Sequence, residues 1–133
     1  MKCILILLFV NILFINCYSQ TGEDFFNKGF EKYNLKDYKG AIADYSKAIE
    51  INPNIIDVYK NRGLAEIRQL DYKSAVDDFS KHIEKNSKDA DAFYNRGLAK
   101  VLLKQKESGC LDLNKSGELG HEKAELAIKR NCN

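Results

Sequence analysis

A five-residue segment occurs twice in this chain at a spacing of 34 residues. Residues 61–65 read Asn-Arg-Gly-Leu-Ala, and residues 95–99 read the same. A further glycine, Gly29, lies 34 residues before Gly63. Similarity at a fixed period of about 20 to 50 residues is typical of arrays in which like units stack in a row. This period restricts the chain to such a stack.

Each unit contains apolar residues spaced three and four apart, which predicts two amphipathic helices per unit. Asp37 and Asp71 are expected to cap the second helices, because a carboxylate can accept the free N–H groups of a first turn. Pro53 should end the first pair of helices, since proline cannot continue a helix. Glycine inside a helix is unfavourable, so Gly29 and Gly63 predict close approach of a neighbouring helix.

The spacing of the signature residues resembles that of the tetratricopeptide repeat family. In the first unit these residues are Phe25, Gly29, Asp37, Tyr38, Ala41, Tyr45, Ala48 and Pro53. The resemblance implies an all-α fold, a right-handed α-solenoid of three helix-turn-helix repeats followed by a C-terminal capping helix. We expect the repeats at residues 22–55, 56–89 and 90–120, and the capping helix at residues 121–131.

The resemblance also implies a non-enzymatic function in protein–protein interaction, with a peptide or a helix of an unidentified partner held in a concave groove. The positions that line such grooves in the family are occupied here by Phe26, Asn27, Phe30, Tyr33, Lys60, Asn61, Leu64, Arg68, Tyr94, Asn95 and Leu98. Only Asn61 matches the subfamily that grips acidic tails, so an apolar or amphipathic ligand is expected. Self-association through Phe26 and Phe30 is an alternative.

Residues 1–19 have the pattern of a secretory signal peptide. Lys2 precedes an apolar run, and small residues at Cys17 and Ser19 favour cleavage before Gln20. This predicts export to the periplasm of a bacterium or to the outside of the cell, with residues 20–133 as the mature domain. The alternative is lipidation of Cys17, which would make the chain a membrane-anchored lipoprotein of an envelope assembly complex.

The mature domain is almost neutral and keeps two cysteines. Lys2 is the only charged residue of the leader, so 20 basic and 19 acidic side chains remain, which argues against binding nucleic acid. The two cysteines are Cys110 and Cys132. In an exported chain they predict a disulfide that fastens the C-terminus to the preceding helix.

The sequence offers no arrangement for catalysis, for a cofactor or for a metal ion. Its serines lack the glycine-framed turn of a nucleophile and a matching histidine with an acid. His82 replaces a small repeat residue and is expected to be partly buried, and His121 lies too far along a helix from Cys110 to share a metal with it. The paired acids Asp77-Asp78 and the acids at Asp89 and Asp91 are expected to lie on solvated faces or to cap helices.

Overall fold

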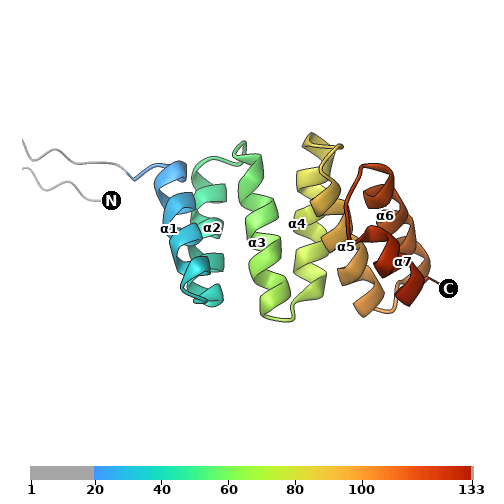
Figure 1. Cartoon of the computed structure of the whole chain (residues 1–133). Helices are drawn as coiled ribbons and strands as arrows, with labels where there is room; N and C mark the ends of the chain where they lie inside the picture. Colours follow the sequence, from blue (N-terminus) through green and yellow to red (C-terminus); the bar gives the residue numbers. More distant parts are fainter. Residues whose placement is uncertain (1–19, 133) are drawn as a thin grey trace, which may run out of the picture.

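The computed structural model describes residues 20–132, and within them it contains seven α-helices and no strand (Figure 1). The helices are α1 (Gly22–Asn34), α2 (Tyr38–Ile51), α3 (Ile56–Arg68), α4 (Tyr72–Lys85), α5 (Ala90–Leu102), α6 (Lys106–Glu118) and α7 (Ala124–Asn131). The predicted all-α solenoid is confirmed. The expected signal peptide at residues 1–19, with Cys17, lies outside the described residues.

The helices form a single row in which each one packs against the next, with α1 and α7 at opposite ends (Figure 1). The first helix of each unit also contacts the first helix of the following unit, so α1, α3, α5 and α7 are linked directly. No such contact joins α2 to α4 or α4 to α6. The row therefore curves toward the first helices. The surface of α1, α3, α5 and α7 that faces away from the second helices lies on the concave side of this curve, and we call it the inner face.

Local signals in the sequence set the ends of the helices. Asp37 accepts the N–H of Gly40 at the start of α2, and Asp71 accepts the N–H of Ser74 at the start of α4. Both caps agree with the sequence prediction. Helix α2 ends at Ile51, just before Pro53, because proline disfavours helical backbone at the residue that precedes it.

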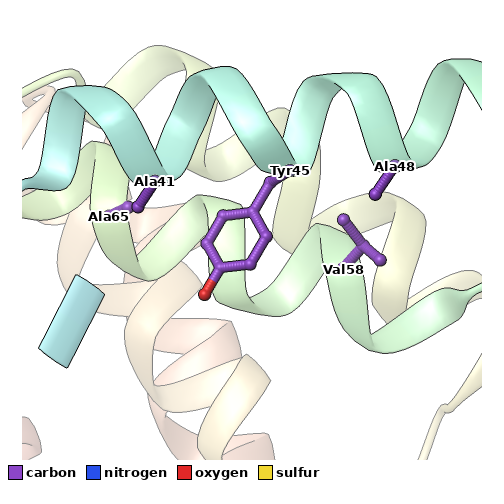
Figure 2. Packing of buried hydrophobic residues seen from close by; sticks show 5 residues of the cluster. All are labelled: Ala41, Tyr45, Ala48, Val58 and Ala65. Carbon is purple, nitrogen blue, oxygen red and sulfur yellow. The ribbon is translucent and has the colours of Figure 1, made fainter. Parts of the chain in front are cut away.

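The buried cluster between the first and second units is built from small and large apolar residues in alternation. Its members are Ala41, Tyr45, Ala48, Val58 and Ala65 (Figure 2). Gly29 makes room for the ring of Tyr45, because a Cβ atom at this glycine would lie only 2.6 Å from Cδ1 of that ring. Burial raises the pKa of the Tyr45 hydroxyl to about 12.

The C-terminal helix begins three residues later than the sequence predicted. Gly120 has a φ of 90°, and the N–H of Lys123 donates to Nδ1 of His121 at 3.2 Å. The ring of His121 stacks on Tyr94 with their centroids 4.0 Å apart. These contacts hold residues 121–123 in a turn, so α7 starts at Ala124.

A disulfide joins Cys110 of α6 to Cys132 at the end of α7, with an S–S distance of 2.07 Å and a sequence separation of 22. This is the pairing that the sequence predicted. Only Ala124 and Ala127 of α7 are buried, so the helix has a small apolar contact area of its own. The disulfide supplements this contact by tying the far end of α7 to α6.

Candidate partner-binding face

The N-terminal part of the inner face is aromatic. Phe30 is 49% exposed, and Phe26 and Tyr33 are half-buried. The ring of Phe26 packs on Tyr45 at a centroid distance of 5.9 Å, so Phe26 also belongs to the core. Asn27 is exposed. Phe30 is therefore the aromatic side chain of α1 that is most accessible to a partner.

Of the two groove cations predicted from the sequence, Lys60 is paired with a carboxylate and Arg68 is exposed. Nζ of Lys60 lies 2.9 Å from Oδ2 of Asp89. A hydrogen bond with the hydroxyl of Tyr33 raises the pKa of Arg68 above its ordinary value. The middle of the inner face thus has less free positive charge than the sequence suggests.

Two of the three predicted groove asparagines use their amide groups on their own helices. Nδ2 of Asn61 donates to the carbonyl of Asp57 at 2.8 Å, and Nδ2 of Asn95 donates to the carbonyl of Asp91 at the same distance. Between these residues, Leu64 is half-buried and packs against the core cluster of α4 and α5. The centre of the inner face is therefore shaped by apolar contacts and by amides that are already engaged.

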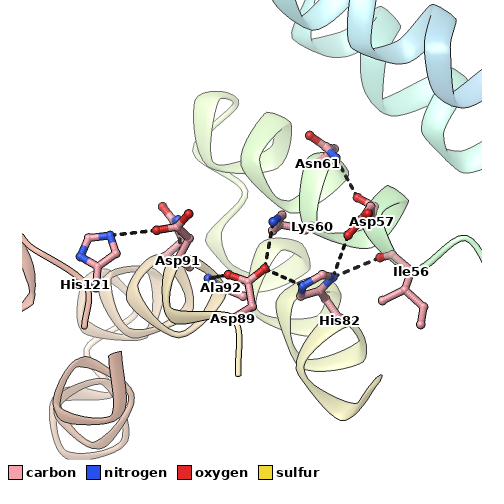
Figure 3. Close-up of polar contacts among 10 residues, drawn as sticks. Ile56, Asp57, Lys60, Asn61, His82, Asp89, Asp91, Ala92 and His121 are labelled. Atoms are coloured by element: carbon pink, nitrogen blue, oxygen red, sulfur yellow. Dashed lines mark hydrogen bonds and ion pairs between the residues drawn. The ribbon is translucent and has the colours of Figure 1, made fainter. Parts of the chain in front are cut away.

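His82 is at the centre of a polar junction that joins the second and third units (Figure 3). The side chain is fully buried, and its Nε2 lies 2.9 Å from Oδ2 of Asp89 while its Nδ1 lies 3.2 Å from the carbonyl of Ile56. The other carboxylate oxygen of Asp89 accepts the N–H of Ala92 and caps α5.

The charge state of Asp89 follows from these contacts. Burial by itself would raise the pKa of Asp89, but hydrogen bonds from Lys60, Ala92 and His82 lower it below its ordinary value. An ionised Asp89 thus binds two side chains and a helix N-terminus at once. The junction holds α3, α4 and α5 together, which accounts for the burial of His82.

The C-terminal part of the inner face ends in a cavity of about 300 Å³ between α5 and α7. It is lined by Tyr94, Leu98, Lys123, Leu126, Ala127, Arg130 and Asn131. Tyr94 and Leu98 are predicted groove residues, and the structure places them on its α5 wall. The α7 wall has no counterpart among the predicted groove residues.

A buried pair of charges repeats along the array and was missed by the sequence interpretation. Asp78 is 2% exposed and accepts two hydrogen bonds from Arg62, at 2.6 Å from Nε and 2.8 Å from Nη2. Arg96 makes the same two bonds to Asp112 in the next unit, at 2.8 and 2.7 Å. The expectation that Asp78 lies on a solvated face was therefore wrong, because an arginine of the paired helix neutralises it.

These arginines also connect neighbouring units. Nη1 of Arg62 donates to the hydroxyl of Ser46 at 2.9 Å, and Nη1 of Arg96 donates to the hydroxyl of Ser80 at 3.1 Å. Each serine hydroxyl in turn donates to a carbonyl one turn earlier in its helix. Both hydroxyls are thus engaged in contacts that join neighbouring units of the array.

Glu66 is the one acid in this interior whose pKa rises strongly. It is 6% exposed, and burial together with the nearby charge of Asp78 raises its pKa to about 8. Arg62 lies 3.8 Å away but has its shorter contacts with Asp78, so its opposing effect is smaller. Near neutral pH, Glu66 is therefore largely protonated.

The described part of the chain contains no group of three or more histidine, cysteine or acidic side chains that could hold a metal ion. None of the helices within residues 20–132 has both the length and the apolar character needed to cross a bilayer.

A sequence model of the tetratricopeptide repeat family matches residues 23–55. No curated protein matches the sequence significantly. Among solved structures, the first tetratricopeptide repeat domain of Spaghetti (RPAP3), bound to the HSP90 peptide SRMEEVD, is similar with a TM-score of 0.80 and 23% identity, over 89% of this chain and 95% of that chain.

Two further structures share the architecture. The tetratricopeptide repeat domain of Arabidopsis OM64 aligns with a TM-score of 0.79 and 25% identity, over 84% of this chain and 94% of its own. YrrB, described as a tetratricopeptide repeat protein with an unusual peptide-binding site, aligns with a TM-score of 0.77 and 23% identity, over 85% of this chain and 59% of its own.

Proposed function

Because this chain is a tetratricopeptide repeat protein, a family of protein–protein interaction modules, we propose that it is an adaptor that binds a peptide or a helix of another protein along its inner face. The interaction requires no cofactor and no catalytic group. The chemistry of this face restricts which partner segments can bind.

The observation that carries the proposal is the exposure of Phe30 beside the half-buried aromatic side chains of Phe26 and Tyr33. A phenylalanine that is half-exposed on a helix, beside half-buried aromatic neighbours, loses water when a partner covers it, and this favours binding. Leu64 and Leu98 extend the apolar strip to α3 and α5. The strip suits a partner segment with its own row of apolar side chains.

The charges of the inner face support an apolar or amphipathic ligand over an acidic tail such as the SRMEEVD peptide bound by the Spaghetti domain. Lys60 is paired with Asp89. An acidic tail would have to compete with Asp89 for Lys60. It would also meet Asp57 and Asp91, which are exposed at the start of α3 and α5.

The test compares two exposed apolar residues on different faces. A photo-reactive phenylalanine analogue at position 30 would identify the partner by cross-linking, and calorimetry with the purified partner would then measure affinity. Phe30→Ala should weaken binding by about 1 to 2 kcal/mol. Leu111→Ala, on the outer helix α6 and 71% exposed, should leave it unchanged. Equal affinity in both variants would refute the groove assignment.

We also propose that the chain is exported, with the leader at residues 1–19 removed before Gln20. The disulfide supports this proposal, since such bonds persist in oxidising compartments. Intact mass on protein from an exporting bacterial host reads the N-terminus directly. A mass that begins at Gln20 would establish a periplasmic or secreted adaptor, whereas a lipid on Cys17 would establish the membrane-anchored alternative.

Self-association would use the same aromatic residues of α1. Sedimentation across a range of concentrations separates this alternative from partner binding. A monomer at all concentrations would leave Phe26 and Phe30 available for another protein. A dimer that is lost in Phe30→Ala would assign this end of the inner face to a second copy of the chain.

A further inference from the structure

The cavity at the C-terminal end of the inner face has an apolar centre. Tyr94 and Leu98 of α5 form one wall, and Leu126 and Ala127 of α7 form the other. Leu126 is 52% exposed, which is a large apolar exposure for a residue that lines a cavity. An apolar group that entered here would cover Leu126 and gain contacts on both sides.

Two cations flank this apolar centre. Lys123 and Arg130 line the cavity together with Leu126, and their spacing of seven residues separates them by about 10 Å along the axis of α7. Neither side chain forms an ion pair with any residue in the range 20–132. No aspartate or glutamate lines the cavity.

The lack of a partner for these two cations contrasts with the cations buried between the helices. Arg96 and Lys100 both pair with Asp112, at 2.7 and 2.8 Å, and Lys60 pairs with Asp89. The cavity is thus a place on the inner face where positive charge and apolar surface are both available to a ligand. A complementary ligand has an apolar body and a negative charge.

We propose that this cavity binds one large apolar side chain of a partner protein together with a carboxylate next to it. The proposal rests on the proposed function, because the cavity continues the inner face beyond Leu98. A volume of about 300 Å³ is at the lower limit of ligand pockets, which suits one residue and its neighbouring carboxylate. Lys123 and Arg130 bind the carboxylate, and Leu126 and Tyr94 contact the apolar side chain.

The carboxylate has two possible sources, a free C-terminus or an acidic side chain, and three small probes distinguish them. The first is N-acetylphenylalanine, which carries a free carboxylate. The second is its amide, which does not. The third is a phenylalanine–aspartate dipeptide blocked at both ends. Amide chemical shifts of the ¹⁵N-labelled protein would report binding of each probe near Tyr94, Leu98 and α7.

If the carboxylate is a free C-terminus, N-acetylphenylalanine should bind at these residues at least about fivefold more tightly than its amide does. Preferential binding of the blocked dipeptide would assign the site to an internal acidic residue, and either result supports the proposal. Arg130→Gln and Lys123→Gln should each lower the affinity for the preferred probe about two- to fivefold. Leu126→Ala should lower the affinity for all three probes.

Lys129→Gln is the matched control, since Lys129 is an exposed cation of the same helix that does not line the cavity. Binding of the amide as tight as that of both carboxylate probes, or equal effects of Arg130→Gln and Lys129→Gln, would overturn the proposal. Circular dichroism of each variant would check that α7 remains folded, and Arg130→Lys should restore most of the affinity lost in Arg130→Gln. These outcomes are independent of the Phe30→Ala test, because a partner could bind at Phe30 without entering the cavity.

Discussion

Removal of the disulfide should destabilise the C-terminal end of the array selectively. Helix α7 has eight residues, and isolated helices shorter than about 12 residues are marginal in water. Its buried side chains are only those of Ala124 and Ala127, so apolar burial contributes little. The disulfide closes a loop with a sequence separation of 22, for which the loss of chain entropy in the unfolded state corresponds to about 3 kcal/mol.

The perturbation is the double variant Cys110→Ser/Cys132→Ser, compared with oxidised and with reduced protein. With a urea dependence of about 1.5 kcal/mol per molar for the cooperative unit that contains α6 and α7, a loss of about 3 kcal/mol lowers the unfolding midpoint of that unit by about 2 M. Hydrogen exchange followed by mass spectrometry would locate the loss. Exchange should become faster in α7 and at the end of α6 while α1 to α4 keep their protection.

Two results would refute this reasoning. A midpoint that shifts by less than about 0.3 M in urea would mean that packing of α7 on α6 suffices to hold it. Faster exchange spread evenly from α1 to α7 would mean that the array unfolds as one unit and that the bond stabilises all of it. The reduced wild type should match the double variant, because both lack the covalent link but keep the same backbone.

Three further predictions concern stability and can be checked by urea denaturation. Leu70 is 71% exposed and has a φ of 62°, so Leu70→Gly should stabilise the fold by about 1 kcal/mol, and a loss of stability would contradict the strain argument. Asp112→Asn should lower the free energy of unfolding by about 3 kcal/mol, since it leaves Arg96 and Lys100 without their shared carboxylate. A decrease of less than about 1 kcal/mol would show that these cations reach solvent. Glu66 has a pKa of about 8 in the folded state against an ordinary value of 4.5, so the folded state retains a proton that the unfolded chain loses, and stability falls as pH rises from 4.5 to 8. Glu66→Gln should therefore be more stable than the wild type by about 2 kcal/mol at pH 7 and equal to it at pH 4, whereas a difference independent of pH would exclude this titration.

The 34-residue period was sufficient to predict the helices because it combines several local signals. The apolar spacing sets the face of each helix, Asp37 and Asp71 set the beginning of α2 and α4, and Pro53 follows the end of α2. All of these act within a few residues of one another along the chain. Gly29 could also be interpreted correctly, since a glycine inside a helix at a repeated position indicates a close neighbour, here Tyr45.

The buried charges were not predicted, although the sequence contains a signal for them. Asp44, Asp78 and Asp112 follow the same period, and Arg62 and Arg96 do so as well. Two adjacent acids such as Asp77 and Asp78 suggest a solvated surface when the facing helix is not taken into account. The pairing becomes visible only when the two helices of one unit are placed face to face, because each bond spans 16 residues.

The inner face shows why position in a repeat does not establish what a side chain is free to bind. Lys60 occupies a groove position of the family, yet the structure pairs it with Asp89. Lys123 and Arg130 were not counted as groove residues, yet both line the cavity between α5 and α7. A partner responds to the charges that remain unpaired after folding, since a paired cation must first lose its carboxylate. The ligand preference of this face should therefore change along its length, from apolar side chains at Phe30 to an apolar side chain with a carboxylate at Leu126.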